Sequence, residues 1–175
     1  MPNYKIISSA SDPLVVLNNQ PYTDAAKNGQ VYDITTGDVT VSGSGYLAAQ
    51  LTIPANQNIT VYILRLIGGS TVSTTFEIYR NAAFTGGTSI TPANNNWDYS
   101  GGSVCTAKYI NQLADPTSGG TLLISVTQAG GGVLLPFDGR IIIPSSTVDR
   151  QFYLLLKNKT TTTNVCSISL AYWEV

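Results

Sequence analysis

The stretch YLAAQLTI, residues 46–53, decides the fold class, because every second residue from Leu47 to Ile53 is apolar. A period of two with one apolar face is typical of a half-buried β-strand. The sequence PANQN that follows, residues 54–58, favours a turn. Further strand patterns lie at residues 60–67, 74–80, 103–109, 121–126, 140–144, 151–158 and 165–175. About eight strands at such short and regular spacing predict an all-β sandwich or barrel.

The first 40 residues do not share this pattern. Prolines interrupt them, yet their isoleucines, leucines and valines are too numerous for a disordered tail. We therefore expect residues 1–40 to form an extended N-terminal arm that lies on a neighbouring surface. Residues 41–175 are expected to form the sandwich domain. The residues expected to make the contacts of the arm are Tyr4, Ile6, Ile7, Leu14 and Val16.

Charge is scarce in this chain of 175 residues: charged side chains make up 11%, with 9 basic and 10 acidic residues and a net charge of −1. Affinity for nucleic acids comes largely from lysine and arginine, so no nucleic-acid partner is expected. Histidine is absent, which excludes a Ser-His-Asp triad and a His-ligated zinc site.

Carboxylates could still catalyse without histidine, as in a small glycosidase with a paired-carboxylate site. The candidates, Glu77, Asp98, Asp138 and Asp149, are more typical of solvated strand or turn residues. We therefore expect a protein that is not an enzyme, with no catalytic residue, no metal and no cofactor.

The lengths of the apolar runs indicate the cellular compartment, and the compartment in turn predicts the state of the two cysteines. The longest apolar runs, such as residues 141–143 and 154–156, are far shorter than a membrane span, and the start of the chain lacks the apolar core of a signal peptide. We expect a soluble protein made in a cytoplasm, without a membrane partner. Cys105 and Cys166 are then expected to be two buried thiols, with a disulfide between neighbouring strands as the alternative.

Several strands are apolar on both faces. In residues 151–158, Phe152 and its alternate neighbours can fill the core, which leaves Tyr153 and Leu155 pointing outward. Exposed apolar patches of this kind usually mark association, so we expect a homo-oligomer, with cover by the chain's own N-terminal arm as the alternative. The expected subunit interface consists of Tyr62, Leu64, Tyr153, Leu155 and Trp173.

A long polar loop, residues 81–102, carries three consecutive asparagines, 94–96, followed by Trp97, Asp98 and Tyr99. An aromatic ring stacked on a sugar, with asparagine bonding its hydroxyls, is a plausible design for carbohydrate binding. Asn95, Trp97 and Tyr99 are therefore the candidate residues of an exposed binding loop. They support a second hypothesis, in which the chain is a receptor-binding or tail-fibre head domain that recognises host-surface carbohydrate.

From Thr74 to its end the chain resembles a family of small tailed-bacteriophage virion proteins, the head decoration, cement or head-fibre proteins. The resemblance covers about 100 residues. The matching segments are TFEIYR at 75–80, GTSITP at 87–92, the asparagines at 94–96, GGTL at 119–122, the glycines at 130–132, YLLLKN at 153–158 and ISLAYWE at 168–174. The chain departs from the family at Asn95, where the family often carries arginine, which places a charge-based role there in doubt.

This resemblance implies a jelly-roll-like antiparallel β-sandwich that assembles as a homotrimer on the surface of a capsid. The major capsid protein would be its partner, and the N-terminal arm would contribute to that contact. The implied function is that of a structural virion protein, a decoration or cement protein that stabilises the head lattice without a catalytic role.

Overall fold

The computed structural model describes residues 3–7, 15–19 and 21–175. These residues are almost entirely β-structure, as predicted, with a single seven-residue helix, α1, at Pro21–Lys27. The strands are β1 Asn3–Ile7, β2 Val15–Asn19, β3 Val31–Thr35, β4 Val39–Val41, β5 Tyr46–Ile53, β6 Thr60–Ser70, β7 Thr74–Arg80, β8 Thr88–Ile90, β9 Ala93–Asn94, β10 Thr106–Gln112, β11 Thr121–Gln128, β12 Gly131–Pro144, β13 Arg150–Asn158 and β14 Asn164–Glu174.

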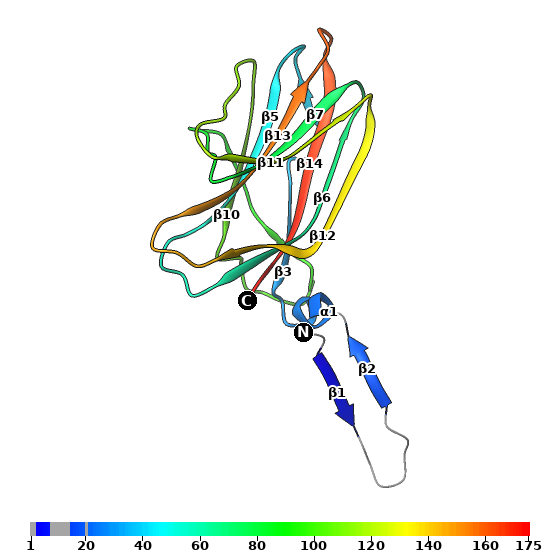
Figure 1. Cartoon of the computed structure of the whole chain (residues 1–175), viewed down its shortest axis with the longest axis vertical. Coiled ribbons are helices and arrows are strands. Elements are labelled where there is room, and N and C mark those ends of the chain that lie inside the picture. The colour runs from blue at the N-terminus through cyan, green and yellow to red at the C-terminus, as the bar shows by residue number, and fades with distance from the viewer. Residues whose placement is uncertain (1–2, 8–14, 20) are drawn as a thin grey trace.

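Two antiparallel sheets pack face to face as a sandwich, which confirms the predicted fold class (Figure 1). The first sheet has the order β11-β7-β13-β5-β10-β8. The second has the order β12-β6-β14-β3-β9, and β4 also pairs with β14. Strands far apart in the sequence therefore lie side by side in both sheets.

The strand pairing is that of a jelly roll. Strands from the first half of the chain pair with strands from the second half in reverse order: β4 with β14, β5 with β13, β6 with β12 and β7 with β11. These pairs alternate between the two sheets, as in a chain folded on itself and then wrapped into two layers. The sequence pattern identifies seven of these eight strands. In place of β4 it counts β10, which extends the first sheet beyond β5.

The sandwich begins earlier than the sequence predicts. Strand β3 pairs with β14 along its whole length, from Thr35 opposite Ser169 to Val31 opposite Trp173. Tyr32 and Ile34 are each only 3% exposed and belong to the core. Residues 31–40 are therefore part of the second sheet and not of an arm. Residues 36–38 connect β3 to β4 within this sheet.

The segment before α1 is a hairpin and not a single extended arm. Strands β1 and β2 pair antiparallel, with Ile6 opposite Val16 and Ile7 opposite Val15, and in the described chain neither pairs with either sheet. Figure 1 shows the hairpin on the far side of α1 from the sandwich. Tyr4 also lies in β1, whereas Leu14 lies outside the described residues.

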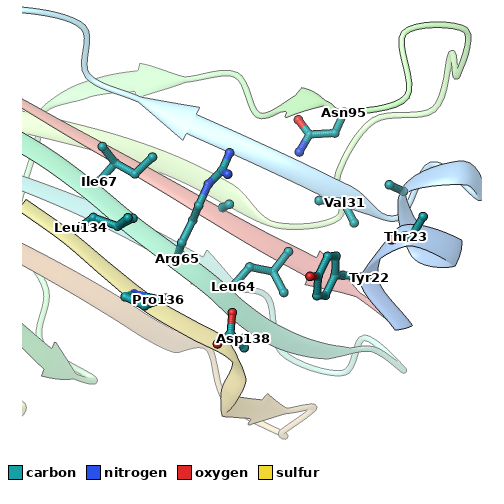
Figure 2. Close-up of a pocket in the computed structure, with 12 residues that line it drawn as sticks. Tyr22, Thr23, Val31, Leu64, Arg65, Ile67, Asn95, Leu134, Pro136 and Asp138 are labelled. Carbon is teal, nitrogen blue, oxygen red and sulfur yellow. The ribbon is translucent and has the colours of Figure 1, made fainter. Parts of the chain in front are cut away.

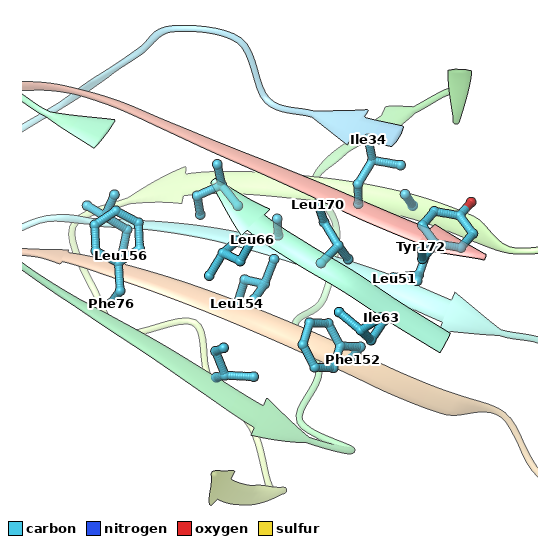
Figure 3. Close-up of a cluster of buried hydrophobic side chains, with 14 of the residues drawn as sticks. Ile34, Leu51, Ile63, Leu66, Phe76, Phe152, Leu154, Leu156, Leu170 and Tyr172 are labelled. Atoms are coloured by element: carbon cyan, nitrogen blue, oxygen red, sulfur yellow. The ribbon is translucent and has the colours of Figure 1, made fainter. Parts of the chain in front are cut away.

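The core fills the space between the two sheets (Figure 3). Alternate residues of β13, including Phe152, Leu154 and Leu156, face Ile63 and Leu170 of the second sheet, and all of them are at most 2% exposed. The two cysteines belong to the same buried cluster and are free thiols, as the sequence predicts.

Buried thiols and phenols predict that alkali destabilises the fold. Burial raises the pKa of the Cys166 thiol from 9.0 to about 11. Burial is also the main reason why the pKa of Tyr153 rises from 10.0 to about 12. Above about pH 9 the unfolded chain releases protons that the folded chain keeps, so the free energy of unfolding falls as the pH rises. Below that pH neither state ionises these groups, and their contribution is constant.

We therefore expect urea unfolding midpoints that are flat to about pH 8.5 and clearly lower at about pH 10.5. A Cys166→Ala variant should show a shallower fall over the same range, because one of the groups is gone. A midpoint that stays constant or rises in alkali would contradict this expectation.

Candidate functional site

The outer face of the first sheet is covered by the chain's own loops. Tyr153 and Leu155 point outward from β13 as predicted, but they are 0% and 1% exposed. Phe84, from the connection after β7, lies over them, and its ring centre is 6.0 Å from that of Tyr153. Lys108 Nζ donates a hydrogen bond of 2.7 Å to the Phe84 carbonyl and holds this connection in place. The prediction that Tyr153 and Leu155 form a subunit interface is therefore wrong.

The outer face of the second sheet is open. Tyr62 and Trp173 lie opposite each other on β6 and β14 and stack with 4.8 Å between ring centres. Both are half-buried, as is Leu64 on the same strand as Tyr62. Ile67 is 43% exposed and Leu134, its register partner on β12, is 62% exposed. The outer face of the second sheet thus exposes apolar side chains, whereas Tyr153 and Leu155 on the outer face of the first sheet are buried.

A groove of about 520 Å³ runs along this face, and we call it the outer groove (Figure 2). Helix α1 forms one wall with Tyr22, which lies next to Leu64 of β6 in the close-up view. Leu134 and Pro136 of β12 form the opposite wall. The remaining lining residues include Val31, Ile67 and Ala171, so that most of the lining is apolar.

The charged residues of the outer groove pair locally. Arg65 Nη2 lies 4.0 Å from Asp33 Oδ2, and Arg140 Nη2 lies 3.5 Å from Asp138 Oδ2. All four side chains are at least a third exposed, so these ion pairs contribute little to stability. They do leave the rim without an unbalanced charge. A neutral rim around an apolar floor suits an apolar protein surface better than a charged small ligand.

The candidate loop, residues 94–99, is fastened to the end of α1. Asn94 Nδ2 donates to the carbonyl of Gly29 at 2.7 Å, and Asn96 Nδ2 donates to the carbonyl of Lys27 at 2.9 Å. The Tyr99 ring lies directly over Gly29, which has a φ of +69°, where a side chain would collide with it. The loop is thus built on a fixed base.

The three residues singled out in this loop are exposed. Trp97 is 96% exposed and Tyr99 is 45% exposed. Asn95 is exposed as well, and it lines the end of the outer groove, so that loop and groove form one continuous surface. Sequence reasoning missed Tyr22, Ile67 and Leu134 as part of this surface. No sequence pattern identifies these residues, because only the tertiary fold brings α1 and β12 to the same groove.

No family model matches the chain, and no curated protein matches it. Among solved structures, it is similar to a mutant VP2 protein of infectious bursal disease virus in derived T=1 particles, with 12% identity over 99% of this chain and 45% of the other, at a TM-score of 0.22. It is also similar to infectious bursal disease virus of the Gt strain, with 12% identity over 99% of this chain and 46% of the other, at a TM-score of 0.21. The chain thus spans less than half of those proteins, and at such scores the likeness carries no argument. None of the helices in the described part of the chain is long and apolar enough to cross a membrane.

Proposed function

We propose that the chain is a structural protein of a virus particle, a decoration protein that attaches to the outside of a bacteriophage head and stabilises its lattice. The observation that carries this proposal is the outer groove: an apolar, locally charge-balanced surface on one face of a rigid sandwich. The sequence resemblance from Thr74 onward supplies the class of partner, the major capsid protein.

The stabilising effect would come from many modest contacts. Fully burying one leucine or isoleucine side chain contributes about 1.5–3 kcal/mol. Ile67 is 43% exposed and Leu134 is 62% exposed, so a partner that covers both side chains would recover a large part of that free energy. A protein that binds the assembled lattice and not its free subunits shifts the equilibrium toward the lattice. Repetition over the particle multiplies the effect through avidity.

The proposal includes a homo-oligomer and a capsid contact of the β1–β2 hairpin. A two-stranded hairpin alone is marginally stable in water. This hairpin pairs with neither sheet among the described residues, so contact with a neighbour would give it the support that its own pairing lacks.

Carbohydrate binding is the second candidate function, and Trp97 is the observation that favours it. An indole that is 96% exposed on a fastened loop could stack on a sugar ring. The amide nitrogen of Asn96 is engaged with Lys27, which leaves Asn95 and Asp98 as the exposed polar residues beside Trp97 in the chain. A glycan array that shows binding by the wild type and not by Trp97→Ala would support this function, and an array without signal would contradict it.

Binding to phage heads tests the main proposal. Ile67→Lys combined with Leu134→Lys places two charges in the outer groove, at positions exposed enough to leave folding intact. With about 1.5 kcal/mol lost at each site, we expect affinity for heads that lack the protein to fall by about a hundredfold. Leu113→Lys is the matched control, because Leu113 is 69% exposed away from the groove.

The measurement is co-sedimentation of purified protein with heads, together with gel densitometry of intact particles. We expect saturable binding in many copies for the wild type and the control. Unchanged binding of the double variant would contradict the role of the outer groove. A few copies per particle would contradict decoration itself.

A further inference from the structure

The two sheets of the sandwich end in four strands, β11 and β8 in the first sheet and β12 and β9 in the second; the three-residue strand β4 pairs with β14 alone and also has a free side. An edge strand exposes unpaired N–H and C=O groups, which pair with another strand unless something prevents it. Natural proteins prevent it with very short edges, prolines, charges or bulges. The four end strands of the two sandwich sheets differ in whether they carry such a device.

Three of the edges do. Strands β8 and β9 have three and two residues. Strand β12 has prolines at 136 and 144, and its register with β6 breaks between Pro136 and Ile141, where Asp138 and Arg140 lie. Each of these edges is too short or too interrupted to accept a long partner strand.

Strand β11 is the exception. Its eight residues, TLLISVTQ, contain no charge and no proline. Every one of them is exposed or half-buried, and Leu122 and Leu123 are 47% and 46% exposed. The bulge opposite Tyr79 lies at the beginning of the strand, so residues 124–128 form a regular ladder with β7 and a regular free edge. An uncharged edge of this length with exposed leucines is a strong site for strand pairing.

We infer that β11 pairs antiparallel with β11 of a second copy of this chain. An antiparallel strand is complementary to an identical strand related by a two-fold axis, because each donor then meets an acceptor at the symmetric position. The two first sheets would join into one continuous sheet of twelve strands, six from each copy. The exposed leucines of each copy would be covered by the other. The inference does not depend on the proposed function, since the outer groove lies on the second sheet.

The mass of the full-length protein in solution tests the inference. We expect sedimentation equilibrium to give a dimer for the wild type and a monomer for Leu123→Lys combined with Ser125→Lys, two exposed positions of β11. Thr88→Lys places the same charge on the opposite edge of the same sheet, and we expect it to remain dimeric. A monomeric wild type, a trimer, or a dimer that persists in the double variant would overturn the inference.

Disulfide cross-linking identifies the partner strand. In a two-fold pair, a residue near the axis faces its own copy, so single cysteines along residues 121–128 should cross-link strongly at one or two adjacent positions and weakly on either side. The native thiols are buried, which keeps them out of this reaction. We expect the same pattern after deletion of residues 1–20. Loss of cross-linking in the deletion variant would assign the edge to the hairpin of a neighbour and overturn the inference.

Discussion

Replacing Tyr153 with alanine is expected to lower the free energy of unfolding by about 3–5 kcal/mol, the range for loss of a buried aromatic side chain. Tyr153 is 0% exposed, with the rings of Tyr79 and Phe84 at 5.8 and 6.0 Å between centres. Its hydroxyl lies 3.1 Å from that of Thr117, so Tyr153 contacts both the connection that carries Phe84 and the segment that carries Thr117. The measurement is urea unfolding of the isolated protein.

Two control variants test whether Tyr153 is covered by the chain's own loops or by another molecule. Tyr153→Phe removes only the bond to Thr117 and should cost about 1 kcal/mol. Tyr62→Ala removes a half-buried ring from the open outer face of the second sheet, and we expect a loss below about 1.5 kcal/mol. If Tyr153→Ala left stability unchanged and instead dissociated an oligomer, the loops would not be the cover of the first sheet.

A second large effect is expected at Glu174, near the end of β14. Glu174 is 7% exposed, and its carboxylate accepts hydrogen bonds from the Ser103 hydroxyl and from the backbone N–H groups of Val104 and Cys105, the latter two at 3.2 Å each. Ser103 Oγ is also 2.7 Å from the hydroxyl of Tyr172. This cluster fastens the segment before β10 to the end of the second sheet.

We expect Glu174→Ala to lower the free energy of unfolding by about 2–4 kcal/mol, because the donors of that segment lose a charged acceptor while they remain largely buried. Glu174→Gln should fall between alanine and the wild type, since it keeps one acceptor oxygen. Glu77→Gln is the matched control: Glu77 is half-buried and accepts one bond, from Tyr79. Thermal unfolding followed by circular dichroism measures all three, and a Glu174→Ala variant as stable as the wild type would contradict the account.

Local periodicity was enough to predict the sandwich and most of its strands. The alternation in Tyr46–Ile53 marks β5 because one face of that strand is fully buried against the other sheet. The same reasoning missed β3 and β4, because they are short and lie among turn residues. Their place is set by pairing with β14, more than 120 residues later in the chain.

Strand periodicity also could not predict which outer face is covered in the strands that are apolar on both faces. Tyr62 and Tyr153 have equivalent patterns, with apolar residues on both sides of each strand. The structure separates them: the connection that carries Phe84 folds over Tyr153, whereas the second sheet has α1 at one end and an open groove beside it. Which loop covers which face is a property of long-range topology, so strand periodicity could not predict it.

We propose that the outer groove is the surface by which the chain attaches to another protein of a virus particle. An electron cryomicroscopy map of purified particles, at a resolution that allows the chain to be traced, tests it most directly. We expect density of a shell protein against Leu64, Ile67 and Leu134. A map in which those side chains face solvent on every copy, or in which the chain does not occur on the shell, would contradict it.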